Sequence, residues 1–363
     1  MLPNFNEGDI WQSLQRETRP IVIYGMGNGA DKLIERLERH GIAYADFFAS
    51  DGFVRGHTFH SKRVLSFSEI REKYNDFVIL LSFATNKPDV LSMLYKMRED
   101  YRLLMPDLPV AGDTTFDVAF YKRHQKELLD VLSLWRDDAS ASVYLSVLNY
   151  KLSGDICYLK NAYQSKEEIY NFLPLNHIRC CMDVGAYRGD TLTEMMTFFP
   201  HLQKAIAIEP DKKSYVKLKS FANAACIPIK TVNAAAWNQI GETVFHQSGN
   251  RNSSLVGASH EHDNLMIPLM TVDSLTSGER IDYIKYDVEG AEAEALLGSS
   301  ATIQRDRPIL AVSIYHRTED IFALPLLMKA LCPDYSFILR RTECLPAWEM
   351  TAFAIPNELF ASE

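Results

Sequence analysis

The feature that most constrains the fold is a strand that runs into a glycine turn near the middle of the chain. Residues 181–190 read CMDVGAYRGD, and Gly185 and Gly189 stand where a side chain would block the approach of a ligand. One βα unit later, Glu209 ends the next apolar strand, where its carboxylate could accept hydrogen bonds from two ribose hydroxyls. The pattern predicts a nucleotide-like ligand at the carboxyl edge of a parallel sheet. A purely structural turn is the alternative.

A second acidic strand end favours the ligand site over the structural turn. Residues 281–292 read IDYIKYDVEGAE, an apolar strand that ends in acids and a glycine. This strand would bring Asp287 and Glu289 to the same edge of the sheet as Glu209. Ligands bind at that edge in open α/β sheets, so we expect these carboxylates to share one site.

These segments resemble the FkbM-type methyltransferases, which use S-adenosylmethionine. The resemblance covers roughly residues 160–356, and the motifs follow the order of the family. They are DVGAYRG at 183–189, IEP at 208–210, NAAA at 233–236, TVDSL at 271–275, KYDVEGAE at 285–292 and VSIYH at 312–316. The match is looser at Arg340, Arg341 and residues 349–351, on the expected substrate side.

The resemblance implies a class I methyltransferase-type, doubly wound sheet with S-adenosyl-L-methionine as the cofactor. In this family context Asp183 would order the glycine turn or meet the methionine ammonium group, whereas elsewhere such a carboxylate caps the following helix. Asn233 and Ala234 end a strand where backbone and amide groups can bond the adenine edge. The cofactor-binding residues implied are Asp183, Gly185, Ala186, Gly189, Glu209, Asn233, Ala234 and Asp287.

The expected acceptor is a hydroxyl, which must lose a proton as it attacks, so a general base is needed. His316 stands at a strand end, and Asp287 is the competing base, with Glu289 beside it as a third catalytic candidate. A lone histidine is also often a satisfied core residue. Asp287, Glu289 and His316 could alternatively hold a divalent cation, but their spacing does not demand one and none is predicted.

Candidate substrate contacts come from a polar loop and from two later strands. The loop at residues 250–255 includes Asn252 and Ser253, whose amide and hydroxyl groups would suit a sugar or polyol. A solvated turn explains the same composition equally well. Tyr315 and Arg340 are the other candidates, with Arg340 suited to an acidic group on the substrate.

A separate glycine turn occurs near the N-terminus. Residues 20–30 read PIVIYGMGNGA, a β-branched strand entering Gly25 and Gly27, and Asp51 follows the next strand where a ribose-binding acid would stand. This region binds a nucleotide or is an interaction or positioning module. We predict an α/β protein with two Rossmann-like domains at 1–112 and 176–363, joined by a helical connector at 113–175.

Composition narrows the function classes. The net charge of −9 comes without a clustered basic patch, which argues against a nucleic-acid partner. The six cysteines form no CxxC pair, which is typical of reduced thiols in a cytoplasm. The sequence has neither the pattern of a secretory signal nor an apolar stretch long enough to span a bilayer. We therefore expect a cytoplasmic protein without a membrane partner. The oligomeric state stays open.

The sequence therefore predicts an S-adenosylmethionine-dependent methyltransferase that methylates a hydroxyl on a sugar, glycan or polyketide-like small molecule. Two rival classes remain. One is an NAD-binding nucleotide-sugar oxidoreductase that uses Gly25, Gly27 and Asp51. The other is a non-catalytic protein that binds an adenosyl ligand and has lost the substrate wall.

Overall fold

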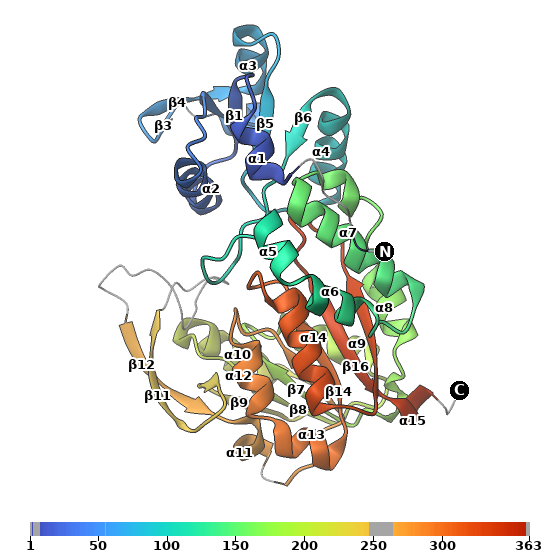
Figure 1. Cartoon of the computed structure of the whole chain (residues 1–363). Coiled ribbons are helices and arrows are strands. Elements are labelled where there is room, and N and C mark those ends of the chain that lie inside the picture. Colours follow the sequence, from blue (N-terminus) through green and yellow to red (C-terminus); the bar gives the residue numbers. More distant parts are fainter. Residues whose placement is uncertain (1, 3–7, 55, 247–263, 277, 361–363) are drawn as a thin grey trace.

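The chain folds into two α/β domains and a helical connector. The computed structural model describes residues 2, 8–54, 56–246, 264–276 and 278–360. Figure 1 shows the smaller N-terminal domain at one end of the larger C-terminal domain, with the green connector helices alongside both. Asn252 and Ser253, predicted as substrate contacts, lie outside the described residues.

The N-terminal domain is built on a six-stranded sheet in the order β3-β4-β2-β1-β5-β6. Its strands are β1 (Ile21–Tyr24), β2 (Asp46–Ala49), β3 (Thr58–Phe59), β4 (Lys62–Ser66), β5 (Val78–Leu81) and β6 (Arg102–Leu104). Its helices are α1 (Ile10–Gln15), α2 (Asn28–Arg39), η1 (Asp51–Phe53), α3 (Phe67–Lys73) and α4 (Pro88–Asp100). All strand pairs are parallel except β3 with β4, so the sheet is Rossmann-like as predicted.

The connector is helical, as predicted. It contains α5 (Val118–Arg123), α6 (Gln125–Leu132), α7 (Asp138–Ser153), η2 (Ile156–Leu159), α8 (Lys166–Phe172) and η3 (Leu175–His177). Asp137 is the N-cap of helix α7, with its side chain accepting a hydrogen bond from the Ser140 amide, and Gly154 is the C-cap, in the left-handed conformation. These are ordinary start and stop signals of a helix.

The C-terminal domain has a seven-stranded sheet in the order β15-β16-β14-β13-β7-β8-β9. Its strands are β7 (Cys180–Val184), β8 (Lys204–Ile208), β9 (Ile229–Val232), β13 (Tyr283–Tyr286), β14 (Ile309–Ser313), β15 (Tyr335–Arg341) and β16 (Met350–Pro356). Its helices are α9 (Asp190–Phe198), α10 (Lys212–Ala224), α11 (Val272–Thr276), α12 (Glu292–Leu297), α13 (Ser300–Asp306), α14 (Asp320–Leu331) and α15 (Asn357–Phe360). Only β16 runs antiparallel to its neighbours, and β7 lies between β8 and β13 where the strand order reverses.

Helices cover both faces of this sheet, which explains the nearly continuous apolar strands. Every residue of β7 and of β14 is buried. Apolar side chains of α8, α9 and α10 pack on one face, while those of α7, α12, α13 and α14 pack on the other. Parallel strands covered on both faces have this composition. The carboxyl ends of the strands are therefore the part of the sheet left for a ligand.

A three-stranded sheet, β10-β12-β11, adjoins the main sheet. It contains β10 (Ala235–Ala236), β11 (Gly241–His246) and β12 (Asn264–Met270). Across the described ranges, none of the helices is both long and apolar enough to cross a bilayer.

Candidate active site

A pocket of about 290 Å³ lies at the carboxyl edge of the C-terminal sheet. One side is formed by the strand ends and turns of the central strands, with Gly185, Glu209, Ala235 and Ala236 in its wall. Carboxylates of Asp287 and Glu289 enter the same wall. Asn86, Lys166, Tyr315, Arg340 and Glu349 also line the pocket.

The glycine turn after β7 needs glycine because the next strand is too close for a side chain. Gly185 has a φ of +94°, a conformation that residues with a side chain rarely adopt. A Cβ atom at this position would lie 1.9 Å from the carbonyl oxygen of Asp287. The amides of Gly185 and Ala186 both donate to the carbonyl of Ile208, at 3.0 and 2.9 Å. The turn is thus fixed against both neighbouring strands, and Gly189 leads from it into α9.

Glu209 is a buried carboxylate at the tip of β8. Its two oxygens accept hydrogen bonds from the amides of Tyr187 and Asp211, each at 2.8 Å. Burial raises the pKa of Glu209 to about 8, against the opposing effect of these two amides. Each oxygen has a further lone pair, so the group can still accept a hydrogen bond from a ligand hydroxyl in the pocket.

Asp183 and Lys285 form the charged floor under the turn. Asp183 has no exposed surface, and neither of its oxygens makes a hydrogen bond with another described residue. Burial raises the pKa of Asp183 to about 7, although Lys285 opposes the rise. Lys285 donates to Asp287 Oδ2 at 3.0 Å and to Thr191 Oγ1 at 3.1 Å. Lys285 therefore holds Asp287 through Oδ2, and the second oxygen, Oδ1, lies on the side of His316.

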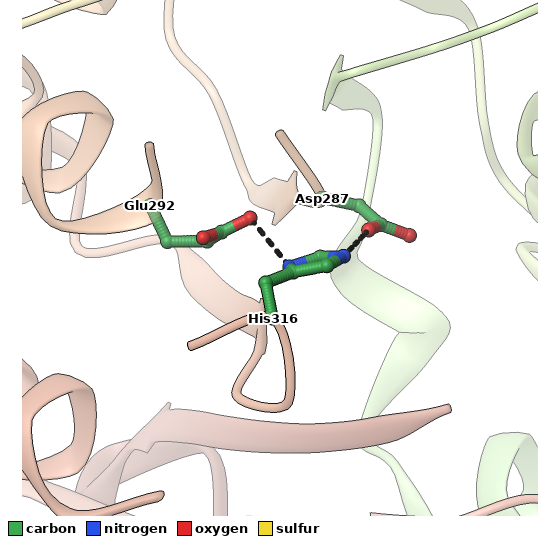
Figure 2. A group of neighbouring side chains, drawn as sticks. All are labelled: Asp287, Glu292 and His316. Atoms are coloured by element: carbon green, nitrogen blue, oxygen red, sulfur yellow. Dashed lines mark ion pairs between the residues drawn. The ribbon is translucent and has the colours of Figure 1, made fainter. Parts of the chain in front are cut away.

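That second oxygen meets His316, which follows β14 and has no exposed surface. Figure 2 shows the imidazole between two carboxylates, with Nδ1 3.0 Å from Glu292 Oε1 and Nε2 3.4 Å from Asp287 Oδ1. Glu289 Oε2 lies 3.6 Å from the same Nε2. Burial lowers the pKa of His316, but Glu292, Asp287 and Glu289 outweigh burial and raise it to about 10. Without a bound cation, the ring carries a proton at neutral pH.

The residues expected to contact adenine lie at the strand end after β9. The Asn233 amide donates to the backbone carbonyls of Glu209 and Pro210, at 2.8 and 3.0 Å. Ala234 is buried. The following residues, Ala235 and Ala236, line the pocket. Asn233 thus positions the tip of β8, and the small side chains beyond it leave space at the wall.

Arg340 lines the pocket but already has a strong partner. Its guanidinium donates to Asp137 Oδ2 at 2.7 Å and to Ser140 Oγ at 2.9 Å, which ties β15 to α7. Recognition of an acidic substrate group by Arg340 would therefore compete with this ion pair. Tyr315 lies in the pocket wall, with its ring centroid 4.2 Å from that of His316.

Several wall residues were not singled out from the sequence. The most informative is Asn86, because it belongs to the N-terminal domain. Its neighbour Thr85 exchanges two backbone hydrogen bonds of 2.8 Å with Leu345, which follows β15. Lys166 of α8 and Glu349 complete the wall. No local motif marks Asn86 or Lys166, whereas Glu349 falls in the looser motif match at residues 349–351.

The N-terminal glycine turn has a packing explanation. A Cβ atom on Gly25 would lie 2.7 Å from Ser82 Oγ, and one on Gly29 would lie 2.1 Å from the Ser82 carbonyl oxygen. Gly25 and Gly29 allow β1, α2 and the end of β5 to pack closely, whereas a Cβ atom on Gly27 would meet no atom within 4 Å. Asp51 is exposed in η1.

The sheet order and the pocket define a methyltransferase-type domain, and comparisons with known proteins identify its family. Residues 183–340 match the methyltransferase FkbM domain. The C-terminal domain therefore belongs to the FkbM methyltransferase family, as the sequence motifs predicted.

One solved structure matches nearly the whole length of the chain. The crystal structure of methyltransferase FkbM from Methylobacillus flagellatus KT has a TM-score of 0.72 at 20% identity, covering 97% of this chain and 94% of that one. The match extends over both domains and the connector, so the whole chain has the fold of that structure. Fibrillarin from Aeropyrum pernix, solved with natively bound S-adenosyl-L-methionine, covers 54% of this chain and 76% of that one at 13% identity, with a TM-score of 0.35. No curated protein sequence matches the chain significantly.

Proposed function

We propose that the protein is an S-adenosylmethionine-dependent O-methyltransferase acting on a hydroxyl of a sugar, glycan or polyketide-like small molecule. The observation that carries this proposal is the single pocket in which the Gly185 turn and Glu209 lie together with Asp287 and Glu289. A ribose-binding acid and candidate bases at one strand edge are what such a reaction needs.

The cofactor side of the pocket fits an adenosyl ligand. Glu209 stands at the strand tip where ribose hydroxyls would donate to it, and the Gly185 turn leaves the backbone open to the ligand. Ala235 and Ala236 provide a flat, small wall for a purine ring. The unpaired carboxylate of Asp183 adds negative potential below a site that would receive a cationic ligand. When bound, S-adenosylmethionine supplies an electrophilic methyl group on a sulfonium.

Asp287 and Glu289 are the residues that would receive the proton of the acceptor hydroxyl. Both line the pocket, whereas His316 is fully buried behind them. An acceptor in the pocket thus meets the two carboxylates first, and His316 acts through Asp287. Lys285 donates to Asp287 Oδ2 at 3.0 Å, which fixes the orientation of this carboxylate.

The acceptor class follows from the polar side of the wall. Asn86, Thr342, Glu349 and Thr351 offer amide, hydroxyl and carboxylate groups that suit a polyhydroxylated acceptor. We infer a reducing compartment such as the cytoplasm for this reaction, because all six cysteines are free thiols.

Calorimetric titration with S-adenosylhomocysteine tests the cofactor pocket. We expect binding by the wild type and a loss of about tenfold in Glu209→Ala, because two hydrogen bonds from ribose hydroxyls contribute about 0.5–1.5 kcal/mol each. Gly185→Ala should abolish binding, since its methyl group would collide with the Asp287 carbonyl.

The matched control is Gly278→Ala. Gly278 also has a positive φ, of +83°, but no atom lies within 4 Å of the added Cβ. It should bind like the wild type. Binding of NAD in place of S-adenosylhomocysteine, or wild-type affinity in both Glu209→Ala and Gly185→Ala, would refute the proposed pocket.

A further inference from the structure

The imidazole of His316 is surrounded by more carboxylates than a structural histidine needs. Glu292 faces Nδ1, while Asp287 and Glu289 face Nε2. Asp287, Glu292 and His316 each present a possible ligand atom within 4.8 Å of the others. All four groups follow β13 and β14 or begin α12, so the sheet itself brings them together.

The contacts at Nε2 are too long for hydrogen bonds but have the spacing of ligands on a shared cation. Nε2 lies 3.4 Å from Asp287 Oδ1 and 3.6 Å from Glu289 Oε2, and it makes no hydrogen bond within the described part of the chain. A hydrogen bond to a carboxylate would be about 2.7–2.9 Å long. Two adjacent ligands at about 2.0–2.2 Å from one metal ion lie roughly 3.0–3.6 Å apart.

Neighbouring contacts orient the carboxylates around the imidazole. Lys285 donates to Asp287 Oδ2 at 3.0 Å. Glu292 is fixed by the amides of Val288, at 2.8 Å, and Gly290, at 3.1 Å, and faces the far nitrogen of the ring. A carboxylate on the second nitrogen of a histidine is the usual way in which proteins orient a metal-binding imidazole.

We propose that His316 Nε2, Asp287 Oδ1 and Glu289 Oε2 bind a divalent cation of the Mn²⁺ type, with Glu292 orienting the imidazole. One imidazole with two carboxylates suits a cation that accepts both nitrogen and oxygen ligands.

The site is open toward the pocket, because Asp287 and Glu289 line it. An acceptor hydroxyl can thus become a further ligand of the cation, which lowers the pKa of the hydroxyl, and its proton passes to the Glu289 carboxylate in the pocket wall. This role in catalysis rests on the proposed methyltransferase function, but binding of the cation does not.

Titration of the metal-free protein with Mn²⁺ alone, followed by electron paramagnetic resonance, tests the site. We expect one bound Mn²⁺ per chain, with affinity reduced at least about tenfold in Glu289→Gln and in His316→Gln. His316 is buried and its variant could misfold, so circular dichroism accompanies each variant. Glu289 has a side chain that is 25% exposed, and Glu289→Gln keeps the test decisive if His316→Gln does not fold.

The control is Glu194→Gln, which removes a different carboxylate from the pocket wall and should retain wild-type Mn²⁺ affinity. Absence of binding at millimolar Mn²⁺, or equal affinity in Glu289→Gln and the wild type, overturns the metal site. S-adenosylhomocysteine binding is measured on the same samples with chelator. A loss of S-adenosylhomocysteine binding would count against the methyltransferase proposal alone, because Gly185 and Glu209 are not ligands of the cation.

Discussion

At the scale of single residues, Glu209 gives a prediction about pH. Its pKa is raised to about 8 by burial, so between its ordinary pKa of 4.5 and about 8 the folded chain holds a proton that the unfolded chain has released. Stability from this group is complete below pH 4.5 and is lost as the pH rises toward 8, by up to about 1.4 kcal/mol per pH unit. Glu209→Gln should flatten the fall in unfolding free energy of the ligand-free protein between pH 5 and 8.

Urea denaturation at three pH values measures this effect. Exposed Glu242→Gln is the control and should follow the wild type at every pH. If Glu209→Gln loses stability with pH as steeply as the wild type, then Glu209 is ionised in the folded state and the predicted cause is wrong.

The sequence could locate Gly185, Glu209, Asp287 and Glu289 in one pocket because parallel strands end at a common edge. It could not show where side chains turn after a strand ends. The Asn233 amide turns back to the β8 backbone, and this depends on contacts with residues more than twenty positions away. The occupied guanidinium of Arg340 depends on Asp137, which is 203 residues away in sequence.

At the scale of elements, that ion pair predicts how α7 is held on β15. Asp137 is partly buried, which by itself raises its pKa, but hydrogen bonds from Arg340 and Ser140 outweigh burial and lower it. Asp137→Asn keeps a good N-cap and removes the charge. We expect a loss of about 1–3 kcal/mol at pH 7. Because the folded pKa is depressed, the stabilisation declines as the pH falls below the ordinary pKa of 3.8 toward the folded pKa, so the difference should be smaller at pH 3 than at pH 7.

Urea denaturation at pH 7 and pH 3 checks this prediction. Asp138→Asn changes the exposed neighbouring carboxylate and should alter stability by less than about 0.5 kcal/mol. A loss of equal size at both pH values in Asp137→Asn would indicate an effect on helix capping, and not the ion pair.

Elements with strong periodicity were predictable, and short pairings were not. The buried strands β1, β5, β7 and β13 follow from their apolar runs and their turns. The two-residue strand β3 and the pairing of Thr85 with Leu345 carry no such signal, because they depend on backbone groups that meet only after the domains pack.

At the scale of the whole molecule, the three parts of the chain share one core. A single cluster of buried apolar side chains contains Ile79 of the N-terminal domain, Leu148 of the connector and Val312 of the C-terminal domain. Leu345 belongs to the same cluster, has no exposed surface and is bonded through its backbone to Thr85. The sequence pattern divides the chain into parts, but it contains no information on the area that those parts bury against one another.

A shared core predicts cooperative unfolding across the domain boundary. Scanning calorimetry should show one transition, and Leu345→Ala should move the whole transition to lower temperature, because removing a buried leucine side chain costs about 2–5 kcal/mol. Exposed Leu129→Ala is the control and should leave the transition in place. Two resolved transitions, of which Leu345→Ala lowers only one, would mean that the N-terminal domain folds independently. In that case Asn86 would belong to a separately moving wall of the pocket, and ligand binding in the C-terminal domain would stabilise only its own transition.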